Sequence, residues 1–159
     1  MLASADWSRN SFGGNTVYQH LPLAVLLADD RSEEAVRTRI MLFNADCDVR
    51  VVHDGVAAVA AASTGEFDLI FMAIEHHVFD GMDATMTIRA LETARQCRRT
   101  RIIGIVDVAS LQNRARLTTC GMDAVLARPV SVRDLQRVLR QHRLSASSLP
   151  LPSHSWITE

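Results

Sequence analysis

Five short strand-like runs, separated by segments of helical length, dominate the pattern of hydrophobic positions. The runs cover residues 23–28, 48–52, 69–72, 102–106 and 124–127. Runs this short and this apolar suit strands that are covered on both faces rather than helices. The second run is the most polar, which is typical of an edge strand. Strands that alternate with helices form a parallel sheet with right-handed crossovers, so the pattern predicts a doubly wound, five-stranded α/β fold.

The segments between these runs carry helix signals. Ser32 is placed to cap the first helix, and Val36, Ile40 and Phe43 recur along it at the spacing of a buried stripe. Further helices are expected at 56–62, 83–95 and 110–119, and a last one is capped by Ser131 with Asp134 three residues on. The apolar residues expected to be buried in the later helices are Met82, Met86, Leu91, Val132, Leu135, Val138 and Leu139.

The 159 residues suit a single domain with terminal extensions. Residues 1–21 show no periodicity and are interpreted as a flexible leader, residues 22–143 as the α/β domain, and residues 144–159 as a disordered tail rich in Ser and Pro. The tail is too short and too polar for a DNA-binding domain. We therefore expect no direct action on DNA.

Composition excludes several classes of function. The net charge of −1 and the pI of about 6.6 provide no overall field that would favour nucleic acid or an anionic membrane. All 17 basic residues are arginine, so chemistry that depends on lysine is absent. The three cysteines lack metal-ligand spacing and suit a reducing compartment, and no apolar run is long enough to span a bilayer. A cytoplasmic location is expected.

The chain is organised around the apolar run that begins after Asp68 and ends at Ala73. A buried strand of this kind delivers its last residue to the carboxyl edge of a parallel sheet, where sites are built. The first strand ends at the same edge with the acidic pair Asp29 and Asp30. Ala73, however, offers only a methyl group.

Residues 23–143 resemble a receiver domain of two-component signalling. The resemblance depends on the order and spacing of Leu26-Leu27-Ala28-Asp29-Asp30, Asp54-Gly55, Asp68-Leu69-Ile70-Phe71-Met72, Asp80-Gly81-Met82, Gly121-Met122-Asp123-Ala124 and Arg128-Pro129-Val130. It implies a flavodoxin-like fold and a signalling module rather than an enzyme. In that family the acidic pair holds Mg²⁺, an aspartate after the third strand accepts the phosphoryl group, and a hydroxyl and a lysine bind it.

This chain departs from the family at nearly every position of that pocket. The acidic pair is kept, but the phosphoacceptor position is occupied by an alanine, the hydroxyl position by a valine, the lysine position by an arginine and the aromatic switch position by a valine. In order, these residues are Asp29, Asp30, Ala73, Val106, Arg128 and Val125. His76-His77 also replaces the usual Met-Pro. The resemblance therefore implies a pseudo-receiver that acts without phosphorylation.

Two hypotheses concern the surviving acidic pair. Asp29 and Asp30 are candidate ligands for a weakly bound Mg²⁺, or Asp30 pairs with Arg128 in its place. We favour the ion pair, because buried charges are usually paired, and we expect no firmly bound cofactor. Asp107 is expected to cap or solvate the loop that follows the fourth strand.

A stripe of arginines marks a candidate partner face on the last two helices, formed by Arg114, Arg116, Arg133, Arg137 and Arg140. In receivers this region is the usual partner and dimer face. The expected partners are a histidine kinase, another two-component protein or a second copy of the chain. Two alternatives stay open: the arginines bind an anionic nucleotide second messenger, or the chain is a phosphorelay receiver in which Ala73 is an engineered replacement of aspartate.

Overall fold

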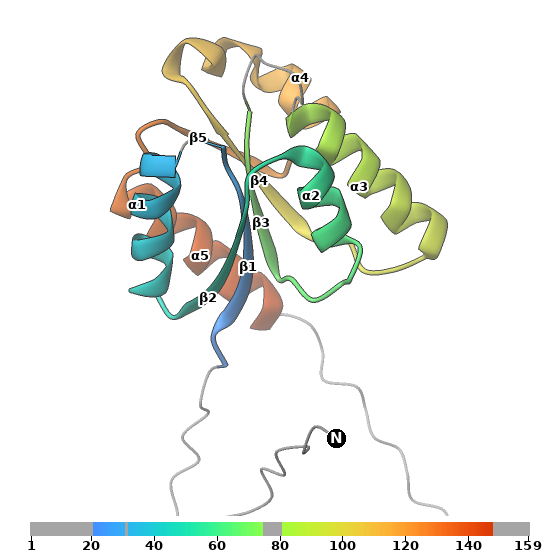
Figure 1. Cartoon of the computed structure of the whole chain (residues 1–159), viewed down its shortest axis with the longest axis horizontal. Coiled ribbons are helices and arrows are strands. Elements are labelled where there is room, and N and C mark those ends of the chain that lie inside the picture. Colours follow the sequence, from blue (N-terminus) through green and yellow to red (C-terminus); the bar gives the residue numbers. More distant parts are fainter. Residues whose placement is uncertain (1–20, 31, 75–80, 148–159) are drawn as a thin grey trace, which may run out of the picture.

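Residues 21–30, 32–74 and 81–147 are described by a computed structural model of the chain (Figure 1). The expected leader, apart from Leu21, and the chain from residue 148 onward lie outside these residues. The expectations for Asp80, His76 and His77 and for the side chain of Ser32 lie outside them as well.

All five strands are parallel and form one sheet in the order β2-β1-β3-β4-β5. Their bounds are Leu23–Ala28 for β1, Cys47–Val52 for β2, Leu69–Ala73 for β3, Arg101–Val106 for β4 and Ala124–Ala127 for β5. β3 lies at the centre, as its unbroken apolar run predicted, and the more polar β2 lies at one edge (Figure 1). The order confirms the predicted flavodoxin-like topology.

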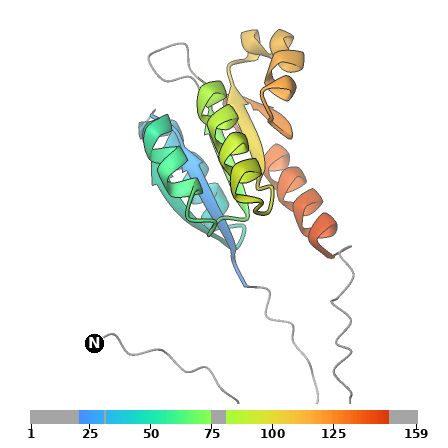
Figure 2. The same ribbon diagram turned by 90° about the vertical axis from the view of Figure 1, so that its right-hand side faces the viewer.

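Helices cover both faces of the sheet (Figures 1 and 2). Their bounds are Ser32–Phe43 for α1, Gly55–Ala62 for α2, Gly81–Arg95 for α3, Arg114–Thr119 for α4 and Val132–Ser147 for α5. Two buried clusters flank the strands. One joins the sheet to α1 and α5 through residues such as Leu42 and Leu135, and the other joins it to α2, α3 and α4 through residues such as Ala58, Ile88 and Leu117.

The predicted cap of the last helix by Ser131 is confirmed, and Asp54 caps α2 in a similar way. The carboxylate of Asp54 accepts a hydrogen bond from the backbone N–H of Ala57 at 2.6 Å. The Ser131 hydroxyl accepts from the backbone N–H of Asp134 at 3.1 Å and donates to its carboxylate at 2.8 Å. Both side chains satisfy backbone donors that a helix leaves unpaired in its first turn.

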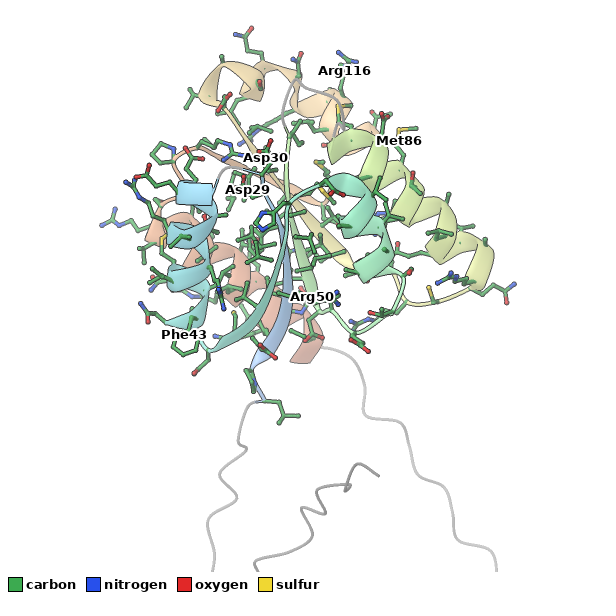
Figure 3. The ribbon with its side chains drawn as sticks, viewed as in Figure 1. Asp29, Asp30, Phe43, Arg50, Met86 and Arg116 are labelled. Carbon is green, nitrogen blue, oxygen red and sulfur yellow. The ribbon has the colours of Figure 1, made fainter. Side chains whose placement is uncertain are left out.

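The predicted buried stripe of α1 is wrong. The helix instead faces the sheet with Ala35, Thr38 and Leu42, all of which are buried. Val36 and Ile40 are each 55% exposed and Phe43 is 74% exposed, and Phe43 points away from the sheet in Figure 3. Both sets of residues recur at helical spacing, so periodicity alone could not decide which one faces the core.

Three smaller expectations about the later helices also need correction. Met86 and Val132 are more than half exposed, because Thr85 and Leu135 take the core-facing positions beside them. Thr85 is buried at little cost, since its hydroxyl donates to the Gly81 carbonyl at 2.7 Å. The helix expected at 110–119 is split into a 3₁₀ turn, Val108–Asn113, and α4. α5 continues past residue 143, where the domain was expected to end.

None of the helices in the described part of the chain combines the length and the apolar character needed to cross a membrane.

Candidate functional site

The strand register gathers the candidate pocket residues at the carboxyl edge of the sheet. Ala28 pairs with Met72, so Asp29 lies level with Ala73 on the neighbouring strand. Ala73 in turn pairs with Ile105, the residue before Val106. Val106 pairs with Ala127, and its carbonyl accepts a hydrogen bond from the backbone N–H of Arg128 at 2.7 Å. The sheet therefore brings together the residues of four strands, as the sequence predicted.

Arg128 and Asp29 form a buried ion pair at this edge. Two guanidinium nitrogens of Arg128 donate to the two carboxylate oxygens of Asp29, at 3.3 and 3.5 Å. The Arg128 side chain is 5% exposed and that of Asp29 is 1% exposed. The planar fork of arginine matches a carboxylate in this two-point geometry, which a lysine ammonium cannot reproduce.

Glu34, in the first turn of α1, is the second carboxylate on Arg128. One guanidinium nitrogen donates to a carboxylate oxygen of Glu34, which joins α1 to the segment that follows β5. Burial acts to lower the pKa of Arg128, but the hydrogen bond with Glu34 and the charge of Asp29 outweigh it, so the pKa is raised. The guanidinium is therefore held as a fixed positive charge between two acidic groups.

Glu34 was not among the residues predicted for this site. It lies five residues after Asp29, in the first turn of α1, where an acid also complements the helix dipole. The available signal was its position in the first turn of a helix that starts at the same sheet edge as Arg128.

The expected pairing of Arg128 with Asp30 needs correction. Within the described residues, the ion pairs of Arg128 go to Asp29, Glu34 and Asp107. Asp30 is exposed, although it stands next to Asp29 in Figure 3. Consecutive residues of an extended chain point to opposite sides, so only one member of the acidic pair can turn toward Arg128.

Of the two roles expected of Asp107, capping the loop or solvating it, the first is wrong. It precedes the 3₁₀ turn, but its side chain makes no capping hydrogen bond. A carboxylate oxygen lies 3.9 Å from Nε of Arg128 instead. Asp107 is thus a third, more exposed acid near the same guanidinium.

Ala73 and Val106 line the pocket without polar side-chain groups. Val106 is fully buried at the end of β4. Ala73 ends β3, where the start of α3 comes so close that a Cβ on Gly81 would lie 2.5 Å from the Ala73 carbonyl oxygen. The close approach explains why a glycine is needed there. Val125 is half-buried on β5 and packs against the cluster on the α4 side.

The described residues contain no group of three or more His, Cys, Asp or Glu side chains that could hold a metal ion. His53 is close to this edge, but its Nδ1 lies 3.2 Å from the backbone oxygen of Asp29 rather than near its carboxylate.

The predicted arginine stripe is divided between two helices. Arg114 and Arg116 are exposed on α4, which packs on the α3 side of the sheet. Arg133, Arg137 and Arg140 are exposed on α5, which packs on the α1 side. Arg137 lies 2.8 Å from Asp134, so part of its charge is already neutralised.

The family model for the response regulator receiver domain matches residues 25–140. The chain belongs to this family. It is 31% identical over 128 residues to the sensor protein GacS of Pseudomonas syringae pv. syringae, and 31% identical over 120 residues to the transcription factor SKN7 of Candida albicans. These matches cover 80% and 76% of the chain but only 14% and 21% of the relatives, so the chain spans a small part of their length.

Solved receiver structures share the fold. The receiver domain of sensor histidine kinase PA1611 from Pseudomonas aeruginosa PAO1, which carries a magnesium ion in its active-site cleft, is 32% identical with a TM-score of 0.66. This match covers 76% of the chain and 96% of that domain. The Saccharomyces cerevisiae Ssk1 receiver domain, solved with the phosphotransfer protein Ypd1, has a TM-score of 0.74 to this chain. The match covers 82% of this chain and 94% of the Ssk1 chain. At 18% identity it shows the fold alone.

Proposed function

We propose that the chain is a non-enzymatic receiver module that acts by protein–protein contact and does not respond to aspartyl phosphorylation. One observation carries the proposal: the guanidinium of Arg128 engages both carboxylate oxygens of Asp29 in a buried pair. By its resemblance to other receivers, Asp29 belongs to the acidic pair that holds Mg²⁺ in the family. In this chain the guanidinium of Arg128 is bound to that carboxylate instead.

Mg²⁺ does not fit the donor set that remains. The ion requires near-octahedral oxygen ligands, and the PA1611 receiver holds it in its cleft. In this chain Ala73 supplies no oxygen from its side chain, Asp29 already binds Arg128, and Asp30 is exposed. The positive charge of Arg128 would also repel a divalent cation. Weak or absent Mg²⁺ binding is therefore part of the proposal.

The remaining pocket positions support the same conclusion. A phosphorylated receiver needs a carboxylate to accept the phosphoryl group and hydrogen-bond donors for its oxygens. Ala73 and Val106 have neither. Arg128 is the one pocket side chain in the described residues that could attract the phosphoryl oxygens, and its guanidinium is engaged by Asp29 and Glu34.

The exposed face of α1 supports a helical signalling protein as the partner. Val36, Ile40 and Phe43 form an apolar stripe on the outer side of the helix. A groove of about 340 Å³ runs beside it, between α1 and the segment after β5, and its lining includes Ile40, Met41 and Val130. An apolar stripe next to a groove is the surface that an amphipathic helix fits. We propose a histidine kinase or a phosphotransfer protein as the occupant.

The arginine stripe on α4 and α5 stays a predicted second contact surface, for a further partner or a second copy of the chain. The proposal includes the cytoplasmic location, since Cys47, Cys97 and Cys120 are thiols and suit a reducing compartment.

The test is incubation of the purified chain with acetyl phosphate and Mg²⁺, read by intact mass and by amide chemical shifts. We expect no mass gain and no shift at Asp30, Ala73 or Val106. The PA1611 receiver serves as a positive control in the same buffer. A gain of one phosphoryl group by this chain would refute the proposal, and it would direct attention to His76, His77 and Asp107 as acceptors.

A further inference from the structure

A cavity of about 350 Å³ lies between the C-terminal halves of α2 and α3. It opens at the amino edge of the sheet, where β3 begins, and so lies at the opposite edge from Ala73 and Arg128. Figure 2 shows α3 from its outer side, with the ends of α2 and α3 at the lower edge of the sheet. The cavity shares no residue with the candidate pocket described above.

The amino-acid sequence of α2 explains why this space is left open. The helix reads GVAAVAAA, so most of the side chains that it turns toward α3 are single methyl groups. Val59 and Ala62 form one wall of the cavity, and Ile88 and Leu91 of α3 form the other. Val59, Ala62 and Leu91 are only half-buried, and although Val59 and Ala62 also pack against the core, all three contribute apolar surface to the cavity lining. This size and this apolar lining are typical of small-molecule sites.

Two arginines stand at the mouth of the cavity. A guanidinium nitrogen of Arg95 donates to the Ser63 carbonyl at the end of α2, at 2.9 Å. Arg98 donates to the Phe67 carbonyl at 3.2 Å and lies 3.5 Å from Asp68. Because a guanidinium carries five N–H donors in a fork, each arginine retains donors beyond these contacts. The mouth can therefore offer charged hydrogen bonds to an anion.

The acidic residue of the cavity lining is already compensated. One carboxylate oxygen of Glu92 accepts from the backbone N–H of Thr100 at 2.7 Å, and the other accepts from Arg89 at 2.7 Å. Both side chains are 12% exposed, so this pair is shielded from solvent. Glu92 thus neutralises Arg89 rather than the two arginines at the mouth.

Further arginines lie at the same edge of the sheet. Burial lowers the pKa of His142, and the charges of Arg101, Arg98 and Arg143 lower it further, against the opposing effect of Asp68. Arginines from three separate segments thus lie near one histidine at this edge, and Asp68 offsets part of their charge. The attraction of the cavity for an anion therefore depends on Arg95 and Arg98 at its mouth.

We propose that the cavity between α2 and α3 binds a small amphipathic carboxylate. Its apolar body packs against Val59, Ala62 and Leu91, and its carboxylate binds at Arg95 and Arg98. The geometry combines an apolar wall with two forked donors at one end, which is the arrangement that a medium-chain carboxylic acid requires. The inference goes beyond the proposed function and does not depend on it.

The test is titration of the full ¹⁵N-labelled chain with octanoate, followed by amide chemical shifts. We expect saturable shifts confined to the C-terminal halves of α2 and α3 and the residues that follow them. Octyltrimethylammonium, which has the same apolar chain and a positive head group, serves as the matched ligand control and is expected not to saturate. Equal binding of the cation would overturn the proposal, as would the absence of saturation by octanoate at millimolar concentration.

Two variants locate the site. Ala62→Phe fills the cavity and is expected to abolish the octanoate shifts. The double variant Arg95→Gln, Arg98→Gln leaves the cavity open and is expected to weaken octanoate about tenfold, since charge-assisted hydrogen bonds are lost. Arg95 and Arg98 are both exposed, so the double variant is expected to fold. It therefore tests the site even if Ala62→Phe does not fold. Octanoate shifts that survive unchanged in a folded variant of either kind would refute the site.

Discussion

Arg128 is the residue on which the candidate site depends most. It is buried between Asp29 and Glu34, and its removal would leave a buried carboxylate without a counter-charge. Breaking a buried ion pair from one side costs about 3 kcal/mol or more. We therefore expect Arg128→Ala to lower the free energy of unfolding by about 3 kcal/mol in urea titrations. Arg128→Lys is expected to lose less, because it keeps the charge and loses only the fork.

A double-mutant cycle separates the ion pair from the loss of packing. In the background of Asp29→Asn, the carboxylate charge is already absent, so Arg128→Ala should cost clearly less than it does in the unmodified chain. Equal costs in both backgrounds would mean that the pair with Asp29 contributes no coupling free energy, and that Arg128 acts through Glu34 or by filling space.

His142 provides a pH-dependent prediction. Its pKa is lowered in the folded chain, chiefly by burial and also by Arg101, Arg98 and Arg143. The unfolded chain then binds a proton at a higher pH than the folded chain does. The contribution of His142 to stability is therefore full above its ordinary pKa of about 6.5 and is lost as the pH falls below it.

The measurement is the free energy of unfolding in urea between pH 7.5 and 5.5, for the unmodified chain and for His142→Gln. We expect the unmodified chain to lose more stability over this interval than the variant does. His53, which follows β2 at the opposite edge of the sheet, offers a matched control, because His53→Gln removes a histidine from a different part of the fold. Parallel pH profiles for the chain and for His142→Gln would contradict the prediction.

At the scale of elements, α1 presents an unexpected apolar stripe to solvent. Surface substitutions away from special features usually change stability by no more than about 0.5 kcal/mol. We therefore expect Ile40→Asp to leave the unfolding free energy nearly unchanged and to weaken the binding of a histidine kinase or phosphotransfer protein. The control is Leu42→Ala on the buried side of the same helix, which should cost about 2–5 kcal/mol. Binding that is unaffected by Ile40→Asp would remove α1 as the contact surface.

The contrast between strands and helices shows what the sequence could predict. The bounds of β1 and β5 were predicted as they are observed, because a buried parallel strand appears in the sequence as an unbroken apolar run. The α1 prediction was wrong, since Ala35, Thr38 and Leu42 recur at the same period as Val36, Ile40 and Phe43. A small residue and a threonine face the sheet, and hydrophobicity ranks both below the residues that stay in solvent.

The candidate site was predicted in outline and corrected in detail. Motif order placed Asp29, Ala73, Val106 and Arg128 at one sheet edge, and the register confirms that placement. The partner of Arg128 could not be predicted, because the choice between Asp29 and Asp30 depends on the direction in which each side chain leaves the strand end. The contact between Glu34 and Arg128 could not be predicted for a related reason, since it forms only when α1 packs beside the segment after β5.

For the molecule as a whole, the buried guanidinium of Arg128 predicts how the stability of the fold depends on Mg²⁺. A ligand that binds only the folded state stabilises it by mass action, by about 1.4 kcal/mol at ten times its dissociation constant. Because Arg128 already occupies Asp29, we expect the unfolding free energy of the unmodified chain to be the same with and without Mg²⁺ at constant ionic strength. Urea titrations in MgCl₂ and in NaCl of matched ionic strength measure this directly.

The converse variant makes the prediction sharper. Ala73→Asp combined with Arg128→Lys returns a carboxylate to the end of β3 and replaces the fork by a point charge that cannot engage both oxygens of Asp29. This double variant is expected to be less stable than the unmodified chain without Mg²⁺ and to regain stability as Mg²⁺ is added. The two curves together attribute the difference to the pocket rather than to general salt effects. Stabilisation of the unmodified chain by Mg²⁺ to the same extent would show that the guanidinium does not exclude the metal, and the proposed function would lose its main support.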